Sequence, residues 1–255
     1  MFQTIQPHPL LAAYVDAYWV SAPEHFAQYR ILPDTCADII FNIGEDIVHA
    51  GDGAIIIAPH TAFVVGTMTT FRDASLTANT RMLGIRFQPG GLKAFMGHPL
   101  HLFTDQHLLL AEVSATWHTT LQNLLAKAKT LAGKIKCLEI FLLQQLPSGN
   151  VTGKQIQHTI SLIKQSKGNI AVATLAAQVF MSNRNYERCF LQQVGVSPKT
   201  FARIVRFIAI KQQLKAGSNG LLLSLALDNG FYDHAHFTRE FSAFSGYSPT
   251  AYLQQ

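Results

Sequence analysis

Two stretches of the chain resemble each other and decide the fold: LAAQVFMSNRNYERCFLQQVGVSPKTF at residues 175–201 and LALDNGFYDHAHFTREFSAFSGYSPTAY at residues 225–252. At an offset of 51 residues the matched positions are Phe180 and Phe231, Arg188 and Arg239, Phe190 and Phe241, Gly195 and Gly246, and Ser197-Pro198 and Ser248-Pro249. Upstream the offset falls to 50, which pairs Leu175 with Leu225 and gives the second copy one extra residue in its turn. Self-similarity of this length indicates an internal repeat.

Each copy of the repeat predicts a helix-turn-helix motif. The short first helix spans about 171–179 in one copy and about 221–228 in the other. Its buried residues are Leu175 in the first copy and Leu222 and Leu225 in the second. After a tight turn the second helix begins at Ser182 or Asp233, whose side-chain oxygens can accept hydrogen bonds from free backbone N–H groups.

The buried face of each second helix is defined by aromatic residues four positions apart, Tyr186 and Phe190 or Phe237 and Phe241. The exposed face then carries Asn183, Arg184, Glu187 and Arg188 in the first copy, and His234, Ala235, Thr238 and Arg239 in the second. A long helix from Ser197 to about Ala216, with Pro198 at its first position, joins the copies. It is about 27 Å long, near one turn of B-DNA, so the two second helices can enter successive major grooves.

Charge is distributed unevenly along the chain. Residues 151–255 hold 11 Lys+Arg and 4 Asp+Glu, a net charge of +7, whereas residues 1–150 hold 9 Lys+Arg and 11 Asp+Glu, a net charge of −2. A basic second half favours an anionic partner, most simply nucleic acid. Charge alone is equally compatible with a solvated cationic surface.

The sequence of the first half predicts a β-rich domain. Four apolar runs, at 38–43, 54–57, 63–65 and 82–87, are bounded by Gly, Pro and Asp and predict strands. After Gly91 the apolar spacing becomes helical. We therefore expect an α+β chain of two domains, a β-barrel or sandwich with helices at 1–148 and an all-α tandem helix-turn-helix domain at 152–255. The turn-forming residues from Pro147 to Gly153 mark the linker.

Composition excludes several classes of protein. In 255 residues, 48% hydrophobic and 14% charged side chains describe a folded chain rather than a disordered one. The three cysteines, Cys36, Cys137 and Cys189, are too far apart for a disulfide framework or a zinc cluster. Neither a signal peptide nor a membrane-spanning run is evident, so we expect a cytoplasmic protein with no membrane partner.

The histidines and cysteines form no recognisable catalytic set. His234 and His236, two residues apart on a helix, point to different faces and make a poor metal pair. Cys36 could serve as a nucleophile, but a single Cys without a His partner is more often a small buried side chain. We expect no catalytic residues, no cofactor, no metal and no enzymatic activity.

The quoted residues also resemble a known family. Leu175-Ala176, Ser182-x-Arg184, Arg188-x-Phe190, Gly195-x-Ser197-Pro198-Lys199-x-Phe201, Gly230-Phe231-x-Asp233 and His236-Phe237-x-Arg239-x-Phe241 are similar to the DNA-binding domain of AraC/XylS-type transcription regulators. More loosely, Leu32-Pro33-Asp34 and Gly84-Ile85-Arg86-Phe87-Gln88-Pro89-Gly90-Gly91 resemble the N-terminal, cupin-like sensor or dimerisation domain of some members. The resemblance implies a bacterial-type, sequence-specific regulator. Its partners would be double-stranded DNA, a small-molecule effector at the N-terminal domain, a second copy of the chain and RNA polymerase.

The resemblance gives the exposed side chains expected roles. Arg184 and Arg188 can each bond guanine O6 and N7, and Glu187 either accepts from cytosine N4 or positions one of these arginines. Arg239 is expected to contact a base or a phosphate, and His234 and Ala235 are expected to face DNA. His236 contacts either the DNA backbone or the domain core. The phosphate candidates on the long helix are Lys199, Arg203, Arg206 and Lys211.

Two departures from the family pattern concern the first copy. Phe180 stands where the family usually has Gly, which argues against a left-handed residue in that turn. The first helix starts near Ala171 without a Ser or Thr cap, at a cost of about 1 kcal/mol of stability.

A second class of function also stays open. It is an enzyme with a barrel catalytic domain, or a DNA-alkylation sensor, fused to a DNA-targeting module, with Cys36 as its only support.

Overall fold

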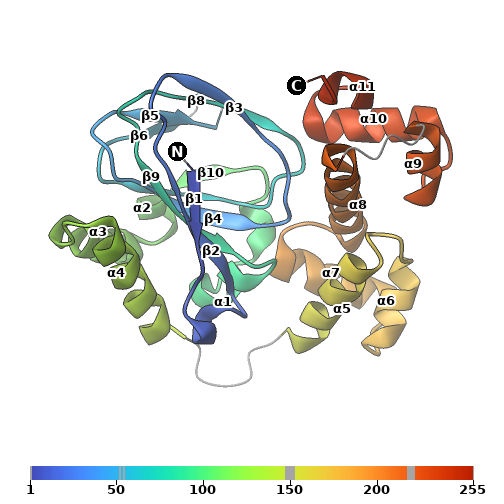
Figure 1. The fold of residues 1–255 in the computed structure, drawn as a ribbon. Coiled ribbons are helices and arrows are strands. Elements are labelled where there is room, and N and C mark those ends of the chain that lie inside the picture. Colours follow the sequence, from blue (N-terminus) through green and yellow to red (C-terminus); the bar gives the residue numbers. More distant parts are fainter. Residues whose placement is uncertain (1, 52, 54, 147–152, 217–221, 255) are drawn as a thin grey trace.

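The computed structural model describes residues 2–254 except 52, 54, 147–152 and 217–221. The chain forms two lobes, a sheet-containing lobe within residues 2–146 and a helical lobe within residues 153–254 (Figure 1). The two-domain α+β fold is therefore confirmed. The predicted linker falls almost wholly outside the described residues, so the domain boundary stays a proposal. No helix in the described ranges is both long and apolar enough to cross a membrane.

One antiparallel six-stranded sheet, in the order β1-β2-β9-β4-β7-β10, organises the first lobe. Its strands are β1 (Phe2–Ile5), β2 (Val15–Ser21), β4 (Ala37–Asn42), β7 (Ala62–Val65), β9 (Met82–Phe87) and β10 (His107–Leu109). Side chains alternate between the faces of the central strands: Ile39 and Ile85 pack with the helices, whereas Ile40 and Met82 belong to a second cluster on the other face. Apolar residues on both faces explain why β4 and β9 were predictable from sequence.

Two short ribbons lie over the second face of this sheet and leave a cavity beneath them. They pair β3 (Ala27–Ile31) with β8 (Arg72–Leu76) and β5 (Val48–Ala50) with β6 (Ile55–Ile57). The sequence predicted β4, β6, β7 and β9 but not the other six strands. In β3 and β8 the residues are mostly polar or partly exposed, so the apolar alternation that marks a strand is weak.

The first face of the sheet is covered by helices. They are α1 (Gly91–Met96), α2 (Leu110–Val113), α3 (Ala115–Lys127) and α4 (Leu131–Gln144), with short 3-10 turns at Pro9–Leu11 (η1) and Leu100–Leu102 (η2). Leu121, Leu138 and Leu142 are fully buried against the sheet. The helical spacing predicted after Gly91 is thus confirmed.

The second lobe contains helices only, within its described residues. They are α5 (Lys154–Gln165), α6 (Val172–Gln178), α7 (Asn183–Val194), α8 (Pro198–Lys215), α9 (Leu222–Asp228), α10 (His234–Ser245) and α11 (Pro249–Tyr252). Two hydrophobic cores share α8: Phe201 and Val205 belong to the core of the first repeat, and Ile204 and Phe207 to that of the second. Helix α8 therefore runs between the two repeats and packs into both (Figure 1). The side chain of Leu222, expected in the second core, lies outside the described part of the chain.

The turn of the first repeat corrects two expectations. Met181 N donates to Ala176 O and Phe231 N to Ala226 O, both at 3.0 Å, so Met181 is the structural counterpart of Phe231. Phe180 instead matches Gly230, with left-handed φ values of 55° and 77°. Pairing Phe180 with Phe231 was therefore wrong, and the extra residue of the second copy is Tyr232. The turn does hold a left-handed residue, although it is not Gly.

Candidate nucleic-acid interface

Helix α7 presents the first set of predicted DNA-facing side chains. Ser182 caps it by accepting from Asn185 N, while Tyr186 and Phe190 are fully buried and fix its rotation. The four residues assigned to its outer face are all exposed: Asn183, Arg184, Glu187 and Arg188. They form one polar surface at the start of the helix, which is the part of a recognition helix that meets base edges.

Arg188 has a hydrogen-bond partner, Asn185, that was not predicted from the sequence. Its Nη2 donates to Asn185 Oδ1 at 2.8 Å, across one helical turn. Glu187, the residue expected to position an arginine or to accept from cytosine, forms no ion pair within the described structure. The i, i+3 spacing of Asn185 and Arg188 was the available signal. This hydrogen bond uses one of the five N–H donors of the Arg188 guanidinium and leaves the others available for another partner.

Helix α10 presents the equivalent surface in the second repeat. Asp233 caps it by accepting from His236 N at 2.6 Å, and Phe237 and Phe241 are buried. His234, Ala235 and Arg239 are exposed, as predicted, whereas Thr238 is half-buried.

A basic cleft of about 580 Å³ lies between α8 and α10, beside the Gly168–Val172 segment. Its cationic lining comes from Lys199, Arg203, Arg206 and Arg239, and the His236 ring also lines it. The cleft thus gathers three of the four predicted phosphate candidates. The fourth, Lys211, lines a separate cleft that includes Asp34 of the first lobe.

The buried carboxylate of Glu240 contacts two side chains of this basic cleft. Glu240 is only 8% exposed and accepts from Arg203 Nε at 3.0 Å, and its Oε2 lies 3.5 Å from His236 Nε2. The His236 ring also packs on Phe231 at 5.2 Å between centroids, so His236 lies on the side of the domain core. Arg206 Nη2 donates to Gly168 O at 3.0 Å. Lys199 and Arg239 remain the exposed cations of the cleft.

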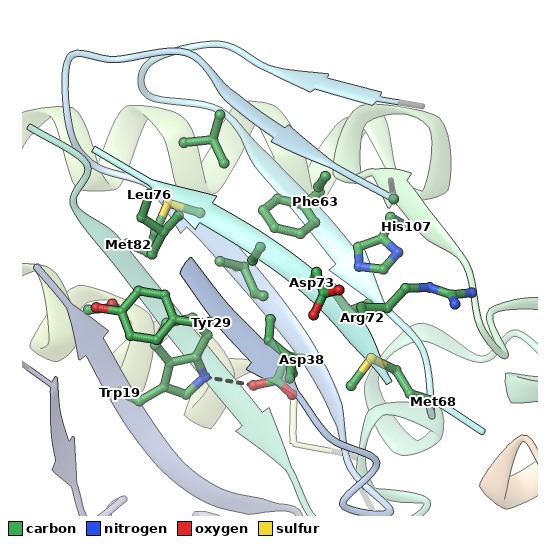
Figure 2. Close-up of a pocket in the computed structure, with 18 of the residues that line it drawn as sticks. Trp19, Tyr29, Asp38, Phe63, Met68, Arg72, Asp73, Leu76, Met82 and His107 are labelled. Carbon is green, nitrogen blue, oxygen red and sulfur yellow. Dashed lines mark hydrogen bonds between the residues drawn. The ribbon is translucent and has the colours of Figure 1, made fainter. Parts of the chain in front are cut away.

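The first lobe contains a cavity of about 440 Å³ between the sheet and the ribbons (Figure 2). Most of its wall is apolar or aromatic, including Trp19, Tyr29, Phe63 and Met82. Asp38, 8% exposed, projects from the central strand β4 and accepts from Trp19 Nε1 at 2.6 Å. Burial raises its pKa to about 6, while nearby Arg86 acts in the opposite direction. Sequence reasoning did not find this site, because its residues come from nine strands that are distant from one another in the sequence.

Cys36, the support for the enzymatic alternative, lines the same cavity. Burial, together with Asp34 and Asp38, raises the pKa of its thiol well above the ordinary value. This is the opposite of the lowered pKa that activates a nucleophilic thiol. Among the described residues, no group of three His, Cys, Asp or Glu side chains could hold a metal ion.

The fold defines a tandem helix-turn-helix protein with a separate β-rich domain. In agreement, residues 175–255 match a helix-turn-helix domain family, and residues 3–109 match a domain family of unknown function, DUF6597. These matches agree with the resemblance to AraC-type regulators at the level of the helix-turn-helix domain.

Individual relatives are distant. An uncharacterized HTH-type transcriptional regulator of Haemophilus influenzae is 31% identical over 93 residues, which cover 36% of this chain and 31% of the relative. The match thus spans about a third of that protein's length. Among solved structures, ToxT from Vibrio cholerae is 11% identical, with 99% of this chain and 98% of that chain covered and a TM-score of 0.48. The C-terminal domain of AraT from Geobacillus stearothermophilus is 17% identical, with 40% and 84% covered and a TM-score of 0.37.

Proposed function

We propose that the protein is a sequence-specific DNA-binding transcription regulator that reads DNA through α7 and α10. The observation that carries this proposal is the repeat itself. Arg188 and Arg239 occupy equivalent exposed positions on two capped helices that a single helix, α8, joins. Each helix would enter one major groove, about 10 base pairs apart, with the arginines on base edges or phosphates.

The basic cleft between the repeats suits the DNA backbone that separates two successive major grooves. Lys199 would contact phosphate there, with Arg203 held in place by Glu240. Binding should then weaken steeply with salt, because phosphate contacts release counterions. Asn183, Arg184, Glu187, His234 and Ala235 complete the proposed recognition surfaces.

The test of the proposal is the binding of full-length variants to a library of sites with single base-pair changes. Arg188→Ala should relax preference at one end of the site and Arg239→Ala at the other. Each should cost about 1–3 kcal/mol if the contact is to a base edge. Lys129→Ala in the first lobe provides a control that also removes one positive charge. Loss of preference at the same base pairs for both arginine variants would contradict the two-groove arrangement.

The first lobe is proposed to bind a small effector in its cavity. The volume of about 440 Å³ and the largely apolar wall are typical of small-molecule sites. The cavity also adjoins the helical lobe: residues Gly66 and Met68 line it, and Thr67 between them donates to Val194 O at the end of α7 at 3.0 Å. A ligand there would act on a loop that contacts a recognition helix.

Two further partners stay expectations. A homodimer would form through the first lobe, and light scattering on the full chain tests this. RNA polymerase would be the partner of an activator, and transcription in a reconstituted system tests that contact.

A further inference from the structure

The cavity of the first lobe has a polar group where a ligand would be most deeply enclosed. Asp38 is on β4, the strand between β9 and β7 in the six-stranded sheet, and its carboxyl group faces the cavity (Figure 2). Its Oδ1 accepts from Trp19 Nε1 at 2.6 Å and forms an ion pair with Arg86, whose Nε lies 3.6 Å away. No described residue donates a hydrogen bond to Oδ2. A buried carboxylate with free acceptor capacity carries a desolvation cost that a ligand can relieve.

Arg30, Arg72 and Arg86 line the cavity, and Arg30 and Arg86 are held by carboxylates. Arg30 forms two hydrogen bonds with Asp73, at 2.7 and 2.8 Å, and its guanidinium stacks on Phe71 and Tyr247. Arg86 lies 3.2 Å from Asp34. Its Nε is 3.6 Å from Asp38 Oδ1, beyond a hydrogen bond, and is buried without a hydrogen-bond partner. Arg86 is therefore shared between two carboxylates, and its contact with Asp38 is longer than its contact with Asp34.

Aromatic rings surround this carboxylate. Trp19 stacks on Phe2 with centroids 5.9 Å apart, and Phe63 stacks on His107 at 6.2 Å. Tyr29, from the covering ribbon, also lines the cavity. The negative faces of aromatic rings attract cations, and a carboxylate among them adds a full charge and a directional acceptor.

We propose that the cavity takes an organic cation, an amine with an aromatic or aliphatic body, whose ammonium group pairs with Asp38. The apolar body lies against Phe63, Val65 and Met82. This inference rests on the proposed effector role of the lobe and names its ligand class. An anionic ligand placed at the same depth would be repelled by Asp38.

The experiment compares three probes of similar shape and different charge on the unaltered full-length chain. They are tryptamine, tryptophol and indole-3-propionate, titrated at millimolar concentration by calorimetry and scored in parallel by thermal shift. The cation should bind about 10- to 100-fold more tightly than the neutral alcohol, as expected for a buried charged hydrogen bond. The acid should bind most weakly.

Two substitutions test whether Asp38 supplies the negative charge that binds the amine. Asp38→Asn keeps the shape of the side chain and should abolish the preference for the amine over the alcohol. Asp73→Asn, at the cavity rim and paired with Arg30, should retain it. Because the probe series uses the unaltered protein, the inference stays testable even if Asp38→Asn does not fold.

Several outcomes would overturn the proposal. They are equal binding of the three probes, tighter binding of the acid, absence of amine binding at millimolar concentration, or an amine preference that persists in a folded Asp38→Asn protein. Tight binding of the acid would leave the lobe as an effector domain and reject only the ligand class. Failure of DNA binding by the unaltered chain, measured separately, would reject the proposed function itself.

Discussion

Phe180 occupies a backbone conformation that its side chain does not favour. Its φ is 55°, and the side chain is 96% exposed, so the left-handed strain is not offset by packing. Phe180→Gly should raise the free energy of unfolding by about 0.5–1 kcal/mol, because Gly adopts this φ freely while gaining some entropy in the unfolded chain. Chemical denaturation measures the change. Phe180→Ala keeps the Cβ strain and should give no comparable gain. Equal effects of the two substitutions would contradict the account.

Asp38 should make stability depend on pH in an unusual direction for a carboxylate. Its folded-state pKa is about 6, above the ordinary value of 3.8, so the folded chain binds a proton more tightly than the unfolded chain. The contribution of Asp38 to stability therefore falls as pH rises from about 4 to about 6, and the penalty is fully present above that range.

The comparison of the unaltered chain with Asp38→Asn isolates this effect. The Tm of the variant minus that of the unaltered chain should be larger at about pH 7 than at about pH 5, because only the unaltered chain gains stability from protonation of Asp38. Differential scanning fluorimetry in matched buffers measures it. A difference that does not change with pH would mean that the pKa of Asp38 is not raised.

At the scale of elements, strong local signals explain which helices were predictable. Ser182, Ser197 and Asp233 each cap a helix in the structure, so the predicted starts of α7, α8 and α10 and the predicted end of α8 agree with it. The ribbons of the first lobe carry no such signals. Strands β3 and β8 pair only with each other and are partly exposed, so their formation depends on partners distant in the sequence.

The candidate interface was predictable to a similar degree. Helical periodicity places Arg184 and Arg188 on the exposed face, as the structure has them. Helical periodicity does not predict contacts between different helices, such as the ion pair between Arg203 of α8 and Glu240 of α10. Nor could it locate the cavity around Asp38, whose walls come from strands that pair non-locally.

Helix α6 lacks a stabilising cap, and adding one should be measurable. Ala171 has the extended conformation of an N-cap, with φ −75° and ψ 141°, but no side chain to accept a hydrogen bond. Ala171→Ser should raise the free energy of unfolding by about 1 kcal/mol. Ala177→Ser, exposed within the same helix, provides the control and should be neutral or slightly destabilising. A gain from Ala177→Ser of the same size would argue against capping.

At the scale of the whole molecule, one loop of the first lobe contacts both recognition helices. It joins β7 to β8, and its Thr67 and Thr70 hydroxyls donate to Val194 O and Ala243 O, near the ends of α7 and α10, at 3.0 and 3.1 Å. Thr104 adds a hydrogen bond to Gly195 O at 2.5 Å. Because the same loop lines the cavity, the proposed effector site and the ends of α7 and α10 share a structural element.

Removing these contacts should uncouple the two lobes. In Thr67→Val/Thr70→Val the recognition helices lose a common support, so we expect DNA carrying both halves of the site to bind several-fold more weakly, whereas DNA carrying one half should bind as before. Fluorescence anisotropy with the two DNAs measures this. Thr69→Val is the matched control, because the Thr69 hydroxyl bonds Asp105 within the first lobe. Unchanged binding in the double variant would show that the loop does not hold the helices for DNA, and tighter binding would show that docking opposes it.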